Sequence, residues 1–312
     1  MDDGVVAGAV TDGEAGDGAV SRGAVSRGPW RRAARRYARR PLGVIALTVL
    51  ALVVLAGVLG GRIAKYPVNH LDLAHVNQAT GPTFAGRHLF GTDYLGRDLL
   101  SQVLYGLHTS ILVALMVAFV ATLFGVLVGA ITGYAGGWVD SVLMGGVDLI
   151  VTIPVLAALL ASIVYFSPLT PTRIGIVLML LMWTTVARVV RSNFAVLRHR
   201  EFVEAAHAAG ASPTRIVFRH LLPNSVGTII VAATSVFGLA LVLEATADFF
   251  NVGTNEVAGP TLGNLIADST KYGNIGQSPW WTWAMPALVL VVLLVCVNFV
   301  GDSLDDAFGA TG

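Results

Sequence analysis

Six stretches of this chain are long and apolar enough to cross a lipid bilayer as α-helices. A spanning helix needs about 20 apolar residues for a hydrocarbon core about 30 Å thick. Backbone groups find no partners in lipid, and none of the stretches alternates like a barrel strand, so helices are the predicted structure. The sequence therefore predicts an all-α membrane protein whose spans cover residues 41–61, 107–134, 141–166, 173–190, 225–247 and 283–300.

Composition supports a membrane protein and excludes several other classes. Only 12% of the residues are charged and 55% are hydrophobic, whereas soluble domains have about 25% charged residues. The net charge of +1 gives no general attraction to nucleic acid. The single cysteine, Cys296, lies in an apolar run and cannot form an internal disulfide.

The distribution of basic residues predicts the orientation. With the N-terminus in the cytoplasm, the inner segments hold thirteen Arg and Lys residues and the outer segments hold six, as the positive-inside rule requires. Both termini are therefore expected in the cytoplasm. The basic cluster PWRRAARRYARR (29–40) precedes the first span. It could instead begin a signal peptide, but the apolar run is too long and has no clear A-x-A cleavage site.

This topology gives the expected domain organisation. Residues 1–40 form a cytoplasmic tail that is disordered before its basic cluster, and residues 41–302 form a six-helix transmembrane domain. Residues 303–312 form a second cytoplasmic tail. The domain includes an external loop at 62–106, a cytoplasmic loop at 194–224 and an external segment at 248–282.

Residues 201–224, EFVEAAHAAGASPTRIVFRHLLPN, are an alanine-rich and charged segment between two apolar runs; we name them the elbow. Apolar residues from Phe202 to Ala209 recur at helical spacing. Gly210 is a typical residue just after a helix end, and Ser212-Pro213 is a typical helix start. The elbow is therefore expected to contain two short helices.

Two interpretations of the elbow follow from these residues alone. It could be an amphipathic connector at the membrane surface, or a docking surface for another protein. Alanines would let a partner approach the backbone closely, while Glu204, Arg215 and Arg219 would supply polar contacts that fix its orientation.

A resemblance separates these interpretations. Glu204-Ala205-Ala206, Gly210 and Leu222-Pro223 resemble the EAA signature of ABC importer permeases. The whole elbow, including His220, is similar to that of the dipeptide/oligopeptide/nickel branch. FGTDYLGRDLLSQVLYGLHTSI (90–111) resembles the external G-T-D-x-L-G-R-D signature of that branch, which here contains Gly91, Thr92, Asp93, Gly96, Arg97 and Asp98.

Three further stretches resemble the same branch: GYAGGWVDSVLMGGVDLIVTIP (133–154), SPWWTWAMP (278–286) and NFVGDSLDDAF (298–308). The resemblance covers most of residues 85–308 and indicates a C-type permease subunit with the type I ABC importer fold. The chain departs from the branch at Gln102, His108 and ATADFFNVG (245–253), on or near the predicted external side. The branch implies dipeptide or oligopeptide cargo by default, with nickel, opines and haem-like compounds as alternatives, and the departures bear on the identity of the cargo and on the outer gate.

The resemblance implies a non-catalytic subunit that works with several partners. The sequence has no G-x-x-x-x-G-K-[ST] phosphate loop, so ATP and Mg²⁺ are expected in separate ATP-binding subunits on the cytoplasmic side. The other expected partners are a second homologous permease, an external substrate-binding protein and membrane lipid, with no nucleic acid. The expected location is the bacterial cytoplasmic membrane.

In such a permease the elbow would transmit the motion of the ATPases. Its rigid-body movement would tilt the fourth and fifth spans and switch the pathway between inward-open and outward-open states. The resemblance assigns this coupling to Glu204, Ala205, Ala206, Gly210, Arg215, Arg219, Leu222 and Pro223.

Ionisable groups at membrane depth are costly and often functional. Asp148 lies near the start of the third span, and Glu244 and Asp248 lie at the outer end of the fifth. These residues and Pro154 are candidates for the translocation path or gate; ion pairing or interface contacts are the alternative. A secondary transporter driven by an ion gradient would use the same carboxylates, but the chain shows no internal repeat typical of that class.

We expect no metal site and no catalytic centre in this chain. His70, His75 and His88 fall in the predicted external loop, but their spacing fits no tetrahedral site. No Ser/His/Asp or Cys/His arrangement is evident.

Overall fold

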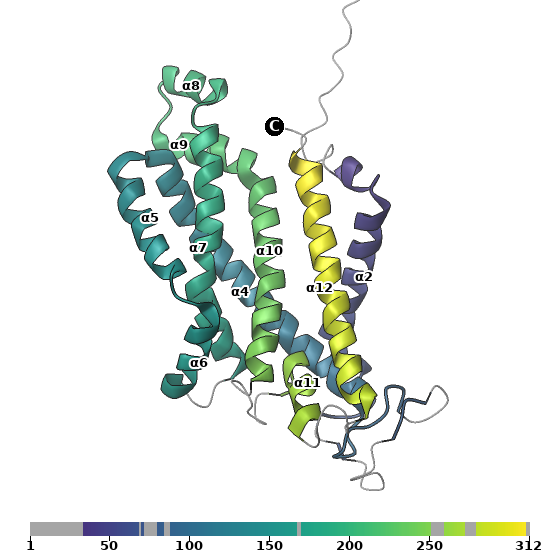
Figure 1. The fold of residues 1–312 in the computed structure, drawn as a ribbon. Helices are drawn as coiled ribbons and strands as arrows, with labels where there is room; N and C mark the ends of the chain where they lie inside the picture. Colours follow the sequence, from purple (N-terminus) through teal and green to yellow (C-terminus); the bar gives the residue numbers. More distant parts are fainter. Residues whose placement is uncertain are drawn as a thin grey trace, which may run out of the picture.

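The computed structural model describes residues 34–68, 70–71, 80–83, 88–166, 170–250, 259–271 and 279–309, and almost all of them are helical (Figure 1). The predicted disordered tail at 1–28 and His75 lie outside the described residues. The main helices are α2 (Pro41–Val58), α4 (Leu99–Ala135), α5 (Gly137–Val151), α6 (Val155–Phe166), α7 (Pro171–Leu197), α10 (Leu222–Phe249) and α12 (Trp280–Gly309). Shorter helices are α3 (Gly60–Ile63), α8 (Glu201–Ala208), α9 (Pro213–Ile216) and α11 (Leu262–Lys271).

Among the described residues, five helices are long and apolar enough to cross a membrane, or six if α5 and α6 form one bent span. This confirms the predicted all-α membrane fold. α4 begins at Leu99, earlier than the predicted start at Leu107, because the Asp98 side chain caps the helix by accepting a hydrogen bond from Ser101 N at 2.8 Å.

The third predicted span, residues 141–166, is two helices and not one. α5 and α6 meet at an angle of 67°. Pro154 lies at the break and has no N–H with which to continue the helix. The residue before a proline is also disfavoured in the helical conformation.

The centre of the bundle is the contact between α4 and α7. Three glycines of α4 follow one another at intervals of four residues and lie directly against the α7 backbone. A Cβ added at Gly125 would lie 2.7 Å from Trp183 O, one at Gly129 would lie 2.6 Å from Ala187 O, and one at Gly133 would lie 2.7 Å from Arg191 O. Small residues at this spacing allow close approach of membrane helices.

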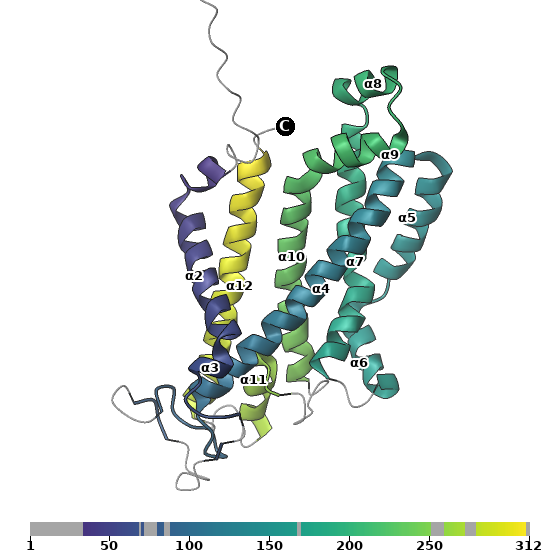
Figure 2. The same ribbon diagram turned by 180° about the vertical axis from the view of Figure 1, so that it is seen from behind.

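The remaining helices complete the bundle around this pair. α10 packs against α4, α7 and α12, and α2 packs against α12 and α4 (Figures 1 and 2). The start of α2 and the end of α12 lie at the same end of the molecule, where Arg40 and Asp306 form an ion pair. α8 and α9 lie at this end too, and α11 lies at the other.

Candidate functional site

The elbow contains the two short helices predicted from its sequence. The first, α8, ends with Gly210 in a left-handed conformation at φ +77°. Gly210 N donates to His207 O at 2.9 Å, and Ala211 N donates to Ala206 O at 3.0 Å. This pair of bonds is the Schellman arrangement, in which glycine avoids the strain that a Cβ would cause. The prediction that Gly210 ends the helix is confirmed.

The second helix, α9, starts as predicted. Ser212 is its N-cap and accepts a hydrogen bond from Arg215 N at 3.4 Å, and Pro213 occupies the first turn. α9 then continues through a π-helical segment, Val217–Leu221, into α10. Pro223 is the second residue of α10 and has no N–H to donate to the preceding turn, while the Asn224 side chain donates to His220 O at 2.6 Å. The elbow therefore joins α10 without an intervening loop.

One side of the elbow is anchored in the bundle and the other is exposed. Val203, Ile216 and Leu221 are fully buried. The predicted coupling residues mostly lie on the opposite side: Ala206 and Leu222 are half-buried, and Glu204, Ala205, Gly210, Arg215, Arg219 and Pro223 are exposed. Phe218 is 65% exposed, two residues after the buried Ile216.

Polar and aromatic contacts join the elbow, and the residues that flank it, to α4 and α7. The His207 ring stacks on Tyr134 with centroids 6.5 Å apart. Arg198 Nη1 lies 3.5 Å from the carbonyl oxygens of Gly133 and Tyr134. Below the elbow, Ser225 Oγ donates to Asn193 Oδ1 at 2.7 Å and joins α10 to α7.

The four predicted path or gate residues do not form one cluster. Glu244 and Asp248 are fully buried one helical turn apart, near the end of α10 that lies away from the elbow. Asp148 is on α5 with 64% of its side chain exposed, and it pairs with Arg188 at 2.6 Å. Pro154 is exposed at the α5–α6 break. Their role in a path remains a prediction.

The residues of the external signature form a compact turn before α4. Asp93 Oδ1 accepts hydrogen bonds from Leu95 N at 2.9 Å and Arg97 N at 2.8 Å, and its Oδ2 pairs with Arg97 Nε at 2.6 Å. Gly91 and Gly96 have φ values of 78° and 76°. Thr92 bridges to Asp98, which then caps α4. The signature therefore builds the entry into α4.

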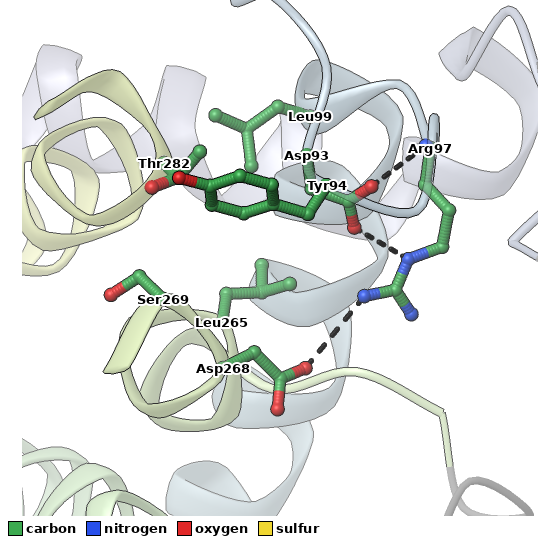
Figure 3. Close-up of a pocket in the computed structure, with 8 residues that line it drawn as sticks. All are labelled: Asp93, Tyr94, Arg97, Leu99, Leu265, Asp268, Ser269 and Thr282. Carbon is green, nitrogen blue, oxygen red and sulfur yellow. Dashed lines mark hydrogen bonds and ion pairs between the residues drawn. The ribbon is translucent and has the colours of Figure 1, made fainter. Parts of the chain in front are cut away.

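A small pocket that sequence reasoning missed lies beside this turn (Figure 3). Arg97 extends between Asp93 and Asp268, with Arg97 Nη2 3.7 Å from Asp268 Oδ2. Asp268 belongs to α11, far along the chain from the turn, and no local pattern could have paired the two. The pocket is lined by Asp93, Tyr94, Arg97, Leu99, Leu265, Asp268, Ser269 and Thr282.

The histidines of the loop before α4 have structural neighbours. His88 Nδ1 lies 2.8 Å from Asp98 Oδ1 in a buried pair. The Tyr66 ring stacks on His70 with centroids 5.0 Å apart and lies 5.4 Å from the His88 ring. Among the described residues, no three His, Cys, Asp or Glu side chains are grouped as metal ligands would be.

The chain is similar to known membrane transport proteins over most of its length. Residues 125–310 match the family described as binding-protein-dependent transport system inner membrane component, and residues 28–80 match the N-terminal TM domain of oligopeptide transport permease C. The oligopeptide transport system permease protein OppC of Mycobacterium tuberculosis is 35% identical over 247 residues, which cover 78% of this chain and 81% of that protein. A protein of Brucella suis that carries a peptide-permease designation is 34% identical over 249 residues, 78% of each chain.

Among solved structures, one chain of the MetNI methionine ABC transporter in an inward-facing conformation shares the fold. The TM-score is 0.54 at 20% sequence identity, and the match covers 66% of this chain and 96% of that chain.

Proposed function

This chain belongs to the family of binding-protein-dependent transport system inner membrane components, and we propose that it is the permease subunit through which partner ATPases drive peptide import. Members of this family are multi-pass permeases of the bacterial inner membrane. The chain has the helices for that location, and the transport role of the family is not catalytic.

The observation that carries the proposal is the form of the elbow. It is held to the bundle by buried side chains, and yet it exposes small, acidic and basic residues together: Glu204, Ala205, Gly210, Arg215 and Arg219. An elbow that served only to connect two spans would not need a rigid and polar outer surface. A groove on a partner protein could receive the alanine face and pair with the charged groups.

The connections of the elbow explain how a contact there could move the pathway. α7 leads directly into the elbow, and the elbow continues through the π-helical segment into α10. A displacement of the elbow therefore acts on two spanning helices at once. In our proposal, closure of the ATPases around ATP moves the elbow and switches the bundle between inward-open and outward-open states. ATP and Mg²⁺ bind to those subunits and not to this chain.

The proposal includes three kinds of partner. ATP-binding subunits contact the elbow on the cytoplasmic side, a second permease completes the pathway, and an external binding protein delivers the cargo. Peptide cargo is supported by the similarity to OppC of M. tuberculosis, an oligopeptide transport permease.

A substitution on the exposed face tests the docking role. Ala205→Trp adds bulk where the chain itself has no packing to disturb, because Ala205 is exposed. We expect the variant to keep the melting temperature of the wild type but to lose co-purification of the ATPase, ATPase stimulation and peptide uptake. Asp302→Trp is the matched control, since Asp302 is exposed on α12 at the same end of the molecule but away from the elbow.

Retention of wild-type uptake by Ala205→Trp would contradict the docking role. Uptake driven by an ion gradient, with this chain alone in vesicles, would contradict the whole proposal and support a secondary transporter. The cargo is tested separately, by identifying the compounds that the external binding protein retains on purification.

A further inference from the structure

Two buried carboxylates, Glu244 and Asp248, lie together at the junction of α4, α10 and the start of α11. Both side chains have no exposed surface. They are four residues apart on α10, so they share one face of the helix. Burial of two negative charges without compensation is strongly unfavourable. Something must therefore neutralise at least one of them.

Within the described part of the chain, no Lys, Arg or His side chain forms an ion pair with either carboxylate. On α4, His108 is directed to Gly57 O of α2, and on α11, Asp268 is directed to Arg97. Among the described residues of the surrounding helices, further titratable groups include Tyr105 on α4, Arg173 on α7, which is exposed, Lys271 at the C-terminal end of α11 and Cys296 on α12.

The hydrogen bonds around Glu244 determine which of its oxygens is satisfied. Ser110 Oγ of α4 accepts a hydrogen bond from Leu262 N at 3.3 Å, so its hydroxyl hydrogen is available for Glu244 Oε1 at 3.1 Å. Glu244 Oε2 is buried and has no hydrogen-bond partner.

Asp248 is in a different environment, which favours its negative charge. Its Oδ2 accepts a hydrogen bond from the hydroxyl of Thr261. Thr261 also caps α11, where its Oγ1 accepts from Asn264 N at 3.1 Å. The carboxylate therefore lies at the N-terminal end of α11, where the helix dipole stabilises an anion. Asp248 Oδ1 is the second buried oxygen without a partner.

Glu244 Oε2 and Asp248 Oδ1 are both buried acceptors without a donor, and one hydrogen held between them would satisfy both. We propose that Glu244 and Asp248 form a buried proton-binding site, in which Glu244 Oε2 carries the proton and donates it to Asp248 Oδ1. The pair then holds one negative charge, and that charge lies on Asp248 beside Thr261 and the start of α11. No transfer to another group is required, because the proton comes from solvent when the site forms.

The site ties three elements together at the end of the bundle opposite the elbow. Glu244 reaches α4 through Ser110, Ser110 reaches the first residue of α11, and Asp248 reaches Thr261. Loss of the proton would place two like charges side by side in this junction and push it apart. The site is therefore a proton-dependent latch between α4, α10 and α11, and it does not depend on the identity of the cargo.

The first test is the pH dependence of stability of the full chain in lipid nanodiscs. We expect the wild-type melting temperature to fall by several degrees as the pH rises above the ordinary range of carboxyl groups. Glu244→Gln keeps a hydrogen donor for Asp248 and has no proton to lose, so its melting temperature should not show this decrease. Asp305→Asn, at an exposed carboxylate of α12, should behave like the wild type.

The second test detects the proton directly in the wild type, and so it applies even if Glu244→Gln does not fold. Infrared spectra at neutral pH should contain the carbonyl band of a protonated carboxyl group, which shifts in D₂O and persists in Asp305→Asn but not in Glu244→Gln. Absence of the band in the wild type, or its persistence in Glu244→Gln, would overturn the proposal. So would stabilisation by added Na⁺ or Ca²⁺ at fixed pH without the band, because the charge would then be balanced by a metal ion. Neither test measures transport, so failure here leaves the docking role of the elbow intact.

Discussion

Arg191 of α7 donates two hydrogen bonds from its guanidinium group to the carboxylate of Asp140 on α5. Nε donates to Oδ1, and Nη2 donates to Oδ2 at 2.6 Å. Two parallel bonds match the planar fork of arginine to the carboxylate. The pair fixes the first turn of α5 against α7, next to the part of α7 that leads into the elbow.

The geometry of this pair predicts that lysine cannot replace Arg191. Arg191→Lys keeps the charge but loses one of the two bonds, and we expect a lower melting temperature with a loss of about 1 kcal/mol in stability. Arg188→Lys is the control, because Arg188 donates one hydrogen bond to a mostly exposed Asp148 and the substitution should change stability little. Equal effects of the two substitutions would show that the paired geometry contributes nothing.

The contact between α4 and α7 predicts strong sensitivity to a single methyl group. In Gly129→Ala the new Cβ would lie 2.6 Å from Ala187 O, a backbone atom that cannot turn away. We expect a loss of about 1–3 kcal/mol, as for an overpacked core. The measurement is the thermal unfolding of the purified chain.

Gly145 of α5 provides the matched control. A Cβ at Gly145 meets nothing within 4 Å, so Gly145→Ala should be neutral or raise stability by up to about 1 kcal/mol through helix propensity. If Gly129→Ala were as stable as Gly145→Ala, the close approach of α4 and α7 would be wrong.

The left-handed conformation of Gly210 predicts a graded response to substitution. Gly210→Ala should cost about 1–2 kcal/mol, because a Cβ disfavours this conformation, even though the added atom meets nothing within 4 Å. Gly210→Asn should cost less, since asparagine adopts the conformation more readily. Hydrogen exchange of the Ala211 amide, which bonds Ala206 O, should be faster in the alanine variant than in the asparagine variant; the reverse order would contradict the assignment.

The cap of α4 gives a further prediction. Asp98→Ala removes the acceptor for Ser101 N and the partner of His88, and it should cost about 0.5–2 kcal/mol. Asp98→Asn keeps an oxygen at the same place and should lose less. Circular dichroism during thermal unfolding measures both, and equal losses would indicate that the cap is not what the aspartate supplies.

Features of the elbow could be predicted because their causes are local. A glycine after a helix and a Ser-Pro pair before the next one act within a few residues, and the structure has both helix boundaries where these residues place them. The residues that anchor the elbow in the bundle were harder to predict from the sequence. Val203 and Ile216 belong to the same buried apolar cluster as residues of α4 and α7, and the sequence of the elbow alone does not reveal those neighbours.

The break between α5 and α6 shows a different limit. The stretch 141–166 is long and apolar enough to be one helix, and length was the criterion that defined the spans. Pro154 was the local sign of a break, but prolines are also tolerated within membrane helices. Whether the chain bends there depends on the packing of α6, which is not a property of the stretch itself.

The buried carboxylates could be predicted in part: their spacing is a local feature, and their partners depend on the fold. The sequence shows that they are four residues apart in a predicted helix, and this spacing places them on one face. Their partners were not, because Ser110 lies 134 residues from Glu244. The glycines at 125, 129 and 133 likewise form a readable pattern, while the identity of the facing helix comes only from the fold.

Backbone contact between α4 and α7 limits how this bundle can rearrange. Where larger side chains lie between helices, they can change rotamer and accommodate sliding. At Gly125, Gly129 and Gly133 the facing atoms include main-chain and Cβ atoms of α7, which no rotamer change can move away. The two helices must therefore travel as a single rigid body. In any conformational cycle of this protein, helices must therefore slide past one another at other contacts, such as those between α10 and α12.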